Sequence, residues 1–290
     1  MKDTFHTNTR LTGVIGHPIK HSYSAYIHNI SFDLKNLDYI YLPFDVPVSN
    51  LRAALKGMVA LNIKGFNVTI PHKEKIIDYL NDISEEASIL GAVNTIVNDL
   101  GKLQGYNTDV YGVLETLKPY KEKLNGKEVT VVGAGGSARA VIYTLIRYFK
   151  PAGITIVNRT EQRAEALKKY FSDKTRFDAF RVRELFPPDL VEVFRESALI
   201  VNATPVGMYP ETDDAITSLG DSFKKGQLVF DLVYNPPVSR LLKLAASRGA
   251  TIIDGLNMLV HQAAKSFELW TGEQMPIDKI YKSLQLVVYK

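Results

Sequence analysis

Short apolar runs alternate with amphipathic stretches along the whole of this chain of 290 residues. Apolar runs of about four to eight residues are typical of buried strands, whereas apolar positions at intervals of three and four are typical of helices. The apolar runs predict strands at 11–16, 39–46, 63–70, 94–98, 129–132, 154–157, 197–202, 228–233 and 251–253. The helical spacing predicts helices within 48–58, 141–149 and 256–267. Such an alternation predicts an α/β fold.

The alternation falls into two successive domains. Residues 1–109 predict an α/β domain with a mixed sheet, because Asp99-Leu100-Gly101 suits a hairpin turn between two short strands. Residues 110–254 continue as the strand and helix units of a doubly wound, Rossmann-type sheet, although the segment 171–194 has no clear period and predicts no element. We expect the helices of 255–290 to complete the first domain and the active site to lie in the cleft between the two domains.

A glycine-rich segment follows the apolar run 129–132. It reads Gly133, Ala134, Gly135, Gly136, Ser137 and Ala138. In a dinucleotide site, Gly133 allows the tight turn, Gly135 lets the backbone approach a pyrophosphate, and Ala138 takes the close-packed third position. The helix predicted within 141–149 would direct its N-terminal N–H groups at the phosphates. The flanking strand and helix favour a dinucleotide site over a simple glycine turn.

The residues after the next strand distinguish NADP from NAD. An NAD site usually has a carboxylate at this point, which binds the ribose 2′-hydroxyl. This chain has Asn158, Arg159 and Thr160, followed by Arg163. Guanidinium groups suit a 2′-phosphate, so the sequence predicts NADP as the cofactor. Arg163 alone is equally typical of a charge on the solvent face of a helix.

Composition excludes several classes of protein and of site. The 35 basic and 31 acidic side chains give a net charge of +4 without a Lys/Arg block, which disfavours nucleic-acid binding. The absence of cysteine excludes disulfides, thiolate catalysis and cysteine-ligated metals. His17 and His21 have a spacing seen in metal sites, but Pro18 opposes a helix that presents both, so we expect no metal. The segment 1–10 is polar and no apolar run is long enough to cross a bilayer, so we expect a cytoplasmic protein that does not bind membranes.

Longer motifs lie on both sides of the glycine-rich segment. They are Gly16-His17-Pro18-Ile19, His21-Ser22-Tyr23-Ser24, His28-Asn29, Asn67-Val68-Thr69-Ile70-Pro71-His72-Lys73-Glu74, Gly91-Ala92-Val93-Asn94-Thr95, Gly105-Tyr106-Asn107-Thr108-Asp109, Asn202-Ala203-Thr204-Pro205, Asp231-Leu232-Val233-Tyr234-Asn235-Pro236 and Gln262-Ala263-Ala264. In this order they cover nearly the whole chain, and together they resemble the shikimate dehydrogenases. The resemblance implies an NADPH-dependent, reversible reduction of 3-dehydroshikimate to shikimate, within chorismate and aromatic amino acid biosynthesis.

The resemblance also implies roles for individual residues. Lys73 and Asp109 match a catalytic dyad at the reacting oxygen, where hydride delivery to the carbonyl carbon leaves negative charge. The matching substrate-binding positions are Ser22, Ser24 and Tyr234 around the substrate carboxylate, and Thr69, Asn94 and Gln262 around the ring hydroxyls. Further cofactor-binding positions are Thr204, Gly255 and Met258, with Met258 against the nicotinamide. Ala25 stands where the family usually has proline, so the entry to the following helix is expected to be less rigid.

Without the motifs, the same residues have plainer interpretations. Lys73 would be a solvated residue early in a helix that begins at Pro71, and Asp109 would cap a helix. Two other functions stay open: a quinate or quinate/shikimate dehydrogenase, and a sensor that binds a related metabolite without turnover. The cations Arg159 and Arg163 disfavour an NAD enzyme of the first kind, and the retained dyad disfavours the second. We expect small molecules as the only other partners, with the chain as a monomer or a homodimer.

Overall fold

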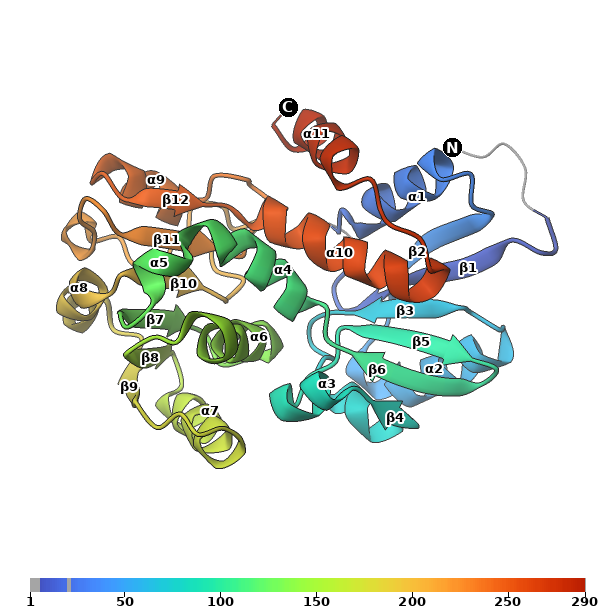
Figure 1. The fold of residues 1–290 in the computed structure, drawn as a ribbon, viewed down its shortest axis with the longest axis horizontal. Helices are drawn as coiled ribbons and strands as arrows, with labels where there is room; N and C mark the ends of the chain where they lie inside the picture. Colours follow the sequence, from blue (N-terminus) through green and yellow to red (C-terminus); the bar gives the residue numbers. More distant parts are fainter. Residues whose placement is uncertain (1–5, 20–21, 290) are drawn as a thin grey trace. The chain divides into compact units, whose positions relative to one another are not determined.

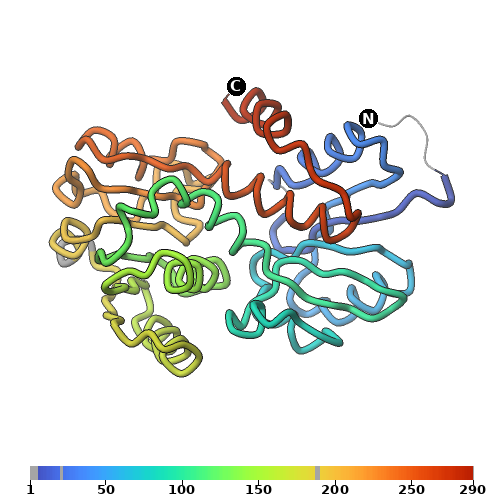
Figure 2. The backbone as a smooth tube through the Cα atoms, in the orientation of Figure 1, coloured from blue at the N-terminus to red at the C-terminus, as the bar shows by residue number. Residues whose placement is uncertain are grey.

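The computed structural model describes residues 6–19 and 22–289, with the side chains of 187–189 excepted; the predicted motif residue His21 lies outside the described residues. The chain divides into two compact units, which are traced in Figures 1 and 2. Unit 1 comprises 1–112 and 260–288, and unit 2 comprises 113–259 with Tyr289. Within the described ranges, no helix is both long and apolar enough to cross a membrane.

Unit 1 is built on a mixed sheet. Its elements are β1 (Arg10–Gly16), α1 (Ser24–Leu34), β2 (Tyr39–Asp45), the 3-10 helix η1 (Val48–Asn50), α2 (Leu51–Ala60), β3 (Gly65–Val68), the 3-10 helix η2 (Lys75–Tyr79), β4 (Asp82–Ile83), α3 (Glu85–Leu90), β5 (Thr95–Asp99), β6 (Lys102–Tyr106) and α11 (Ile277–Val288). The strands lie in the order β2-β1-β3-β5-β6-β4. β1 pairs in parallel with β2 and β3, whereas β5 is antiparallel to both of its neighbours. The mixed sheet expected from the sequence is therefore confirmed.

The hairpin between β5 and β6 has the predicted turn. Asp99 pairs with Lys102, and the two residues between them, Leu100 and Gly101, have φ angles of 50° and 89°. Two successive positive φ angles are typical of the tight hairpin turns whose twist matches that of the strands. The turn brings the β6 end, and with it the segment that leads to Asp109, back toward the start of β5 (Figure 1).

The two faces of the first sheet are covered differently. Phe66 and Val68 of β3 face a core of aliphatic side chains from α2 and the neighbouring strands. The alternate residues of β3, Gly65 and Asn67, face α10 (Gly255–Thr271), because an added Cβ at Gly65 would lie 2.3 Å from the Trp270 indole nitrogen. Asn67 is thus directed at the helix face that also carries the predicted Gln262.

Unit 2 alternates strands and helices throughout. Its elements are the 3-10 helix η3 (Lys118–Tyr120), α5 (Lys121–Leu124), β7 (Glu128–Val132), α6 (Gly136–Thr144) with the π-helical turn η4 (Leu145–Phe149), β8 (Gly153–Asn158), α7 (Glu161–Lys174), β9 (Phe180–Glu184), α8 (Pro187–Glu196), β10 (Leu199–Asn202), the 3-10 helix η5 (Gly220–Ser222), β11 (Leu228–Asp231), α9 (Arg240–Ser247) and β12 (Thr251–Ile253). The helices α4 (Asp109–Leu117) and α10 each belong partly to unit 1 and partly to unit 2 along the chain.

The second sheet is entirely parallel and doubly wound. Its order is β12-β11-β10-β7-β8-β9, so the chain starts in the middle at β7, runs to β9, and then crosses back to β10. In such sheets, ligands bind outside the carboxyl ends of the strands where the order reverses, which here is between β7 and β10. The glycine-rich segment follows β7 and Thr204 follows β10, so the topology places both predicted cofactor elements at the reversal point.

The segment 171–194 contains elements that the sequence pattern did not predict. It holds the end of α7, the edge strand β9 and most of α8. Only Phe180 and Val182 of β9 are buried, because the strand pairs on one side alone and carries arginines at alternate positions. An edge strand of this kind lacks the continuous apolar run by which the other parallel strands were predicted.

Candidate active site

Lys73 lies on a turn that long-range contacts hold in place. The Lys73 carbonyl accepts from the Val93 N–H at 2.8 Å, and the buried His72 ring contacts the Val46 carbonyl through Nε2 at 2.6 Å. The sequence suggested a helix beginning at Pro71, but the structure has turns through 70–74 and a 3-10 helix only from Lys75. The contacts of His72 and Lys73 explain the difference, because they fix this segment against neighbouring loops.

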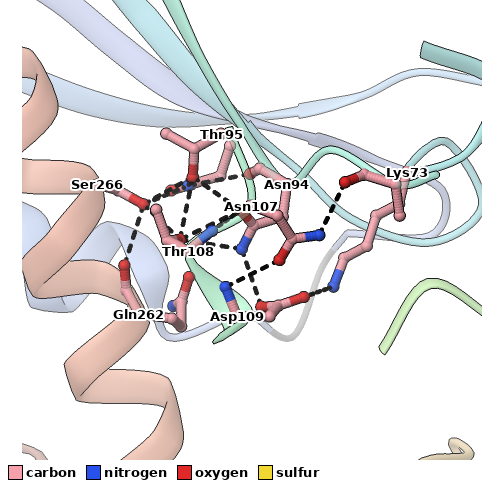
Figure 3. Close-up of polar contacts among 10 residues, drawn as sticks. Lys73, Asn94, Thr95, Asn107, Thr108, Asp109, Gln262 and Ser266 are labelled. Carbon is pink, nitrogen blue, oxygen red and sulfur yellow. Dashed lines mark hydrogen bonds and ion pairs between the residues drawn. The ribbon is translucent and has the colours of Figure 1, made fainter. Parts of the chain in front are cut away.

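Lys73 and Asp109 form a close ion pair. The distance from Lys73 Nζ to Asp109 Oδ2 is 2.6 Å, and the two side chains are 12% and 6% exposed (Figure 3). Asp109 is the first residue of α4, where the aligned peptide dipoles favour a negative charge. A buried ammonium beside a carboxylate presents both an N–H donor and an acceptor to a third group, which is what a hydroxyl or carbonyl being oxidised or reduced requires.

Asn94 holds the other oxygen of Asp109. Its Nδ2 donates to Asp109 Oδ1 at 2.8 Å and to Thr108 Oγ1 at 3.0 Å, while its Oδ1 accepts from the Thr108 N–H at 2.7 Å. An amide nitrogen has two hydrogens, and both are directed at protein atoms here. The side chain that the resemblance placed at a ring hydroxyl is therefore also a direct partner of the catalytic candidate.

Three buried hydroxyls complete this cluster; sequence reasoning quoted two of them in motifs without assigning a role and missed the third, Ser266. Thr95, Thr108 and Ser266 lie within 2.8–3.1 Å of one another through their Oγ atoms. Ser266 is on α10, one turn after Gln262, whose carbonyl accepts from it at 3.1 Å (Figure 3). A polar residue inside the apolar stripe of a buried helix was the available signal, since buried polar groups need partners.

The two predicted serines form a separate pair at the start of α1. Ser22 Oγ lies 3.1 Å from Ser24 Oγ and accepts from the Ser24 N–H at 3.2 Å. Ser24 is the first residue of α1, so its N–H already has the Ser22 hydroxyl as a partner, and the N-cap residue Tyr23 adds no side-chain cap. Backbone N–H groups at such a terminus, together with two hydroxyls, suit a carboxylate. Thr69 lies four residues before Lys73 in the sequence, and its methyl group packs on Gly16 at the end of β1.

The glycine-rich segment has the geometry of a phosphate-binding turn. Gly133 has a φ of 117°, and an added Cβ would lie 3.1 Å from the Ala203 carbonyl oxygen after β10. At Gly135 an added Cβ would meet nothing within 4 Å, so the backbone there is approachable. Ala138 is fully buried, which fits the close-packed third position. The N-cap residue of α6 is Gly135, which has no side chain, and N–H groups at such a helix start suit an anion.

The predicted cations after β8 are exposed. Arg159 and Arg163 are both on the surface, and neither forms an ion pair within the part of the chain that the structure describes. Asn158 Nδ2 donates to the Thr160 carbonyl at 2.8 Å and so shapes the turn that carries Arg159. Two guanidinium groups without carboxylate partners favour binding of a phosphate over a ribose hydroxyl.

The buried carboxylate of Asp231, to which sequence reasoning assigned no role, fixes the loop after β10 through hydrogen bonds. Asn202 Oδ1 accepts from the Thr204 hydroxyl at 2.6 Å, and Asn202 Nδ2 donates to Asp231 Oδ1 at 2.9 Å. Ser239 donates to the other Asp231 oxygen at 2.5 Å. Burial raises the pKa of Asp231 to about 6 in spite of these donors. Thr204 is therefore held in place through Asn202 and Asp231, and the loop that contains Tyr234 leaves from the same strand end.

The start of α10 carries the last two predicted cofactor residues. An added Cβ at Gly255 would lie 2.5 Å from the Leu232 carbonyl oxygen, so only glycine allows this approach. Asp254 caps the helix by accepting from the Leu256 N–H at 3.0 Å. Met258 follows one turn later and is 7% exposed.

Metal ligands do not gather in the described ranges. His17 Nδ1 contacts Asp45 at 2.8 Å, whereas His21 lies outside the described residues. Among the residues that the structure describes, no group of three or more His, Asp or Glu side chains could hold a metal ion.

Family models match the chain along most of its length. A model described as the shikimate dehydrogenase substrate binding domain matches residues 14–96. A model described as shikimate / quinate 5-dehydrogenase matches 115–256, and one described as the shikimate 5′-dehydrogenase C-terminal domain matches 255–285. The first match contains the Lys73 turn and Asn94, and the second contains the whole glycine-rich segment.

Individual relatives agree with these matches. A protein of Caldanaerobacter subterraneus subsp. tengcongensis named shikimate dehydrogenase (NADP(+)) is 43% identical over 281 residues, which are 96% of this chain and 98% of the relative. A crystal structure of a shikimate dehydrogenase in complex with NADP+ has a TM-score of 0.89 at 38% identity and covers 99% of this chain and 98% of its own. The shikimate 5-dehydrogenase of Listeria monocytogenes, in complex with shikimate and NAD, has a TM-score of 0.85 at 36% identity, covering 98% and 99%.

Proposed function

The chain belongs to the shikimate dehydrogenase family, and from that premise we propose that Lys73 and Asp109 are the catalytic pair at the reacting oxygen of its substrate. The protein is an NADP-dependent oxidoreductase that reversibly reduces 3-dehydroshikimate to shikimate. The observation that supports the residue assignment is the buried contact of 2.6 Å between Lys73 Nζ and Asp109 Oδ2. The pair is within a shared hydrogen-bond cluster whose other members also lie in unit 1.

The chemistry sets a role for each member of the pair. NADPH, when bound, supplies a hydride to the carbonyl carbon of the substrate. Lys73 donates an N–H to the carbonyl oxygen, on which negative charge develops in the transition state. Asp109 accepts from a neighbouring substrate hydroxyl and holds the ammonium in place through Oδ2. In the direction of oxidation, the same two groups hold the hydroxyl proton between them.

Substrate binding is assigned to six polar residues. Ser22 and Ser24 at the start of α1 hold the substrate carboxylate, with Tyr234 as a further donor. Thr69 and Gln262 hold the ring hydroxyls; Asn94, which the resemblance places with them, contributes by holding Asp109. Buried groups of this kind also reject a ring that lacks a hydroxyl, because the lost partner leaves them unpaired.

The residues of unit 2 fit NADP. The approachable backbone at Gly135 and the uncapped start of α6 suit a pyrophosphate, and Arg159 and Arg163 suit the 2′-phosphate. We assign cofactor contacts to 133–138, 158–160, Arg163, Thr204, Gly255 and Met258. In the same way, we assign substrate binding to 1–109 with 255–290, and cofactor binding to 110–254.

Location and assembly follow as finer proposals. A biosynthetic reduction that consumes NADPH, in a chain without cysteine, supports a cytoplasmic enzyme. Its ligands are small molecules, and we propose a monomer or a homodimer. Sedimentation at micromolar concentration distinguishes the two.

Initial rates with purified protein test the function and its residues together. Shikimate and quinate are each crossed with NADP and NAD, and nicotinamide absorbance is followed. We expect activity chiefly with shikimate and NADP; rates as high with quinate or NAD indicate the broader dehydrogenase, and ligand binding without turnover indicates a sensor.

Substitution of the lysine tests the catalytic assignment. Lys73→Ala should lower turnover by about 10²-fold or more, because a positioned acid is lost. Lys75→Ala, two residues away on the exposed side of the same segment, is the matched control and should keep the wild-type rate. Equal rates for the two variants would remove Lys73 from the mechanism.

A further inference from the structure

One buried polar side chain of α10 has no place in the assignments above. Ser266 is fully buried, and its neighbours on the helix, Phe267 and Trp270, pack into an aromatic core with α1 and β2. Placing a hydroxyl in such surroundings is unfavourable unless it is hydrogen-bonded. The contacts of Ser266 therefore indicate what it does.

Four polar atoms surround the Ser266 hydroxyl. They are Asn67 Nδ2 at 2.9 Å, Thr95 Oγ1 at 2.8 Å, Thr108 Oγ1 at 3.1 Å and the Gln262 carbonyl oxygen at 3.1 Å. Figure 3 labels Ser266 with Thr95, Thr108 and Gln262. A hydroxyl can donate one hydrogen bond and accept two, so at most three of these four contacts are hydrogen bonds at any one time. Asn67 must donate, and the Gln262 carbonyl must accept. The serine thus joins α10 to β3, to the start of β5 and to the segment before α4.

Two of these partners lead directly to the catalytic pair. Thr95 donates to Asn94 Oδ1 at 3.0 Å, and Thr108 Oγ1 accepts from Asn94 Nδ2 at 3.0 Å. The same Asn94 nitrogen donates to Asp109 Oδ1 at 2.8 Å. Ser266 therefore contacts both hydroxyls that fix the Asn94 amide, and that amide fixes the Asp109 carboxylate.

We propose that Ser266 is a positioning residue, which sets the Asp109 carboxylate beside Lys73 through Thr95, Thr108 and Asn94. The inference rests on the proposed roles of Lys73 and Asp109 and goes beyond them, because Ser266 acts only through other side chains. Hydride transfer needs the reacting groups in a narrow range of distances and angles. A small displacement of the carboxylate slows that step more than it weakens substrate binding.

The first test is Ser266→Ala, compared with Ser31→Ala. Ser31 is also fully buried in a helix of unit 1 and also donates to the carbonyl four residues earlier, that of Ile27 at 2.7 Å, without contacts to the Asn94 cluster. Both changes remove one buried hydroxyl and its intrahelical hydrogen bond. Single-turnover nicotinamide absorbance with shikimate and NADP measures hydride transfer, steady-state rates give KM, and thermal melting compares stability.

The expected result separates positioning from stability. Ser266→Ala should slow hydride transfer about tenfold with KM for shikimate changed less than about twofold, whereas Ser31→Ala should keep the wild-type rate. Ser266→Ala should melt at a lower temperature than Ser31→Ala, because it leaves buried partners such as Asn67 without one contact, so the rates are compared well below both melting temperatures. Equal hydride-transfer rates in the two variants would overturn the proposal. If Lys73→Ala lost activity but Ser266→Ala transferred hydride at the wild-type rate, only this inference would be overturned, and the proposed function would stand.

A double-mutant cycle tests the route. Thr108→Val keeps the shape of the side chain and removes the hydroxyl between Ser266 and Asn94. If both residues act through Asn94, the double variant should be little slower than the slower single variant. Rate effects that multiply would mean that Ser266 acts by another path, which contradicts the proposed route.

Discussion

The two units build their candidate sites by different means. In unit 1, Lys73, Asn94, Asp109 and Ser266 come from distant parts of the chain and are held by hydrogen bonds between buried side chains. In unit 2, the glycine-rich segment is contiguous, and its geometry depends on a positive φ at Gly133 and on uncapped backbone N–H groups. A network of buried charges has little tolerance for the loss of one partner, whereas exposed side chains around a backbone cradle can be exchanged at smaller cost.

The largest effect should come from breaking the unit 1 pair while keeping its shape. In Asp109→Asn, one amide group replaces two carboxylate oxygens, so either the contact with Lys73 or the contact with Asn94 is lost. We expect turnover to fall by about 10²-fold or more, since the ammonium is no longer held at the reacting oxygen. Steady-state rates with shikimate and NADP measure the turnover number, and Asp99→Asn on the exposed hairpin is the control. A loss below about fivefold would show that the charge of Asp109 is dispensable.

The difference between the units also bears on what the sequence could predict. The glycine-rich segment was found from a local pattern, because a turn, an open backbone and a helix start need particular residues in succession. The unit 1 pair was found only through motif resemblance. Thr95 and Thr108 stood in those motifs without an assigned role, and Ser266 was missed, because hydrogen bonds between residues 13, 158 and 171 positions apart leave no periodic signal. Asp231 was missed in unit 2 for the same reason, since its partners lie on other segments.

A second, smaller effect should appear in the stability of unit 1. His28 is fully buried and stacks on Tyr41 with ring centroids 4.4 Å apart, and neither ring nitrogen has a hydrogen-bond partner among the residues that the structure describes. Burial lowers the pKa of His28 from 6.5 to about 3. The unfolded chain therefore binds a proton below pH 6.5 that the folded chain does not bind. Stability should fall by about 1.4 kcal/mol for each pH unit between 6.5 and about 3, and is fully retained above 6.5.

Removing the imidazole should flatten that dependence. Denaturant unfolding of His28→Phe, followed from pH 7 to pH 5, should lose about 2 kcal/mol less than the wild type over this range. His6→Gln changes an exposed histidine and should follow the wild-type curve. Parallel curves for His28→Phe and the wild type would mean that His28 does not titrate between the two states. Any loss of stability in acid would then have to come from ionisable groups outside the aromatic core of unit 1.

The smallest effect should come from the exposed cations of unit 2. Arg159→Gln and Arg163→Gln each remove one partner of a 2′-phosphate and leave the phosphate-binding backbone unchanged. We expect KM for NADP to rise about tenfold in each, with KM for NAD and the turnover number nearly constant, because an exposed charge contributes uniform binding and does not stabilise the transition state alone. Arg176→Gln, beyond the end of α7, is the control for a general loss of positive charge.

If Arg159→Gln or Arg163→Gln instead lowered turnover as strongly as Asp109→Asn, the contrast between a tolerant cofactor unit and an intolerant substrate unit would be wrong. If KM for NAD rose as much as KM for NADP in both variants, the assignment of these arginines to the 2′-phosphate would be wrong.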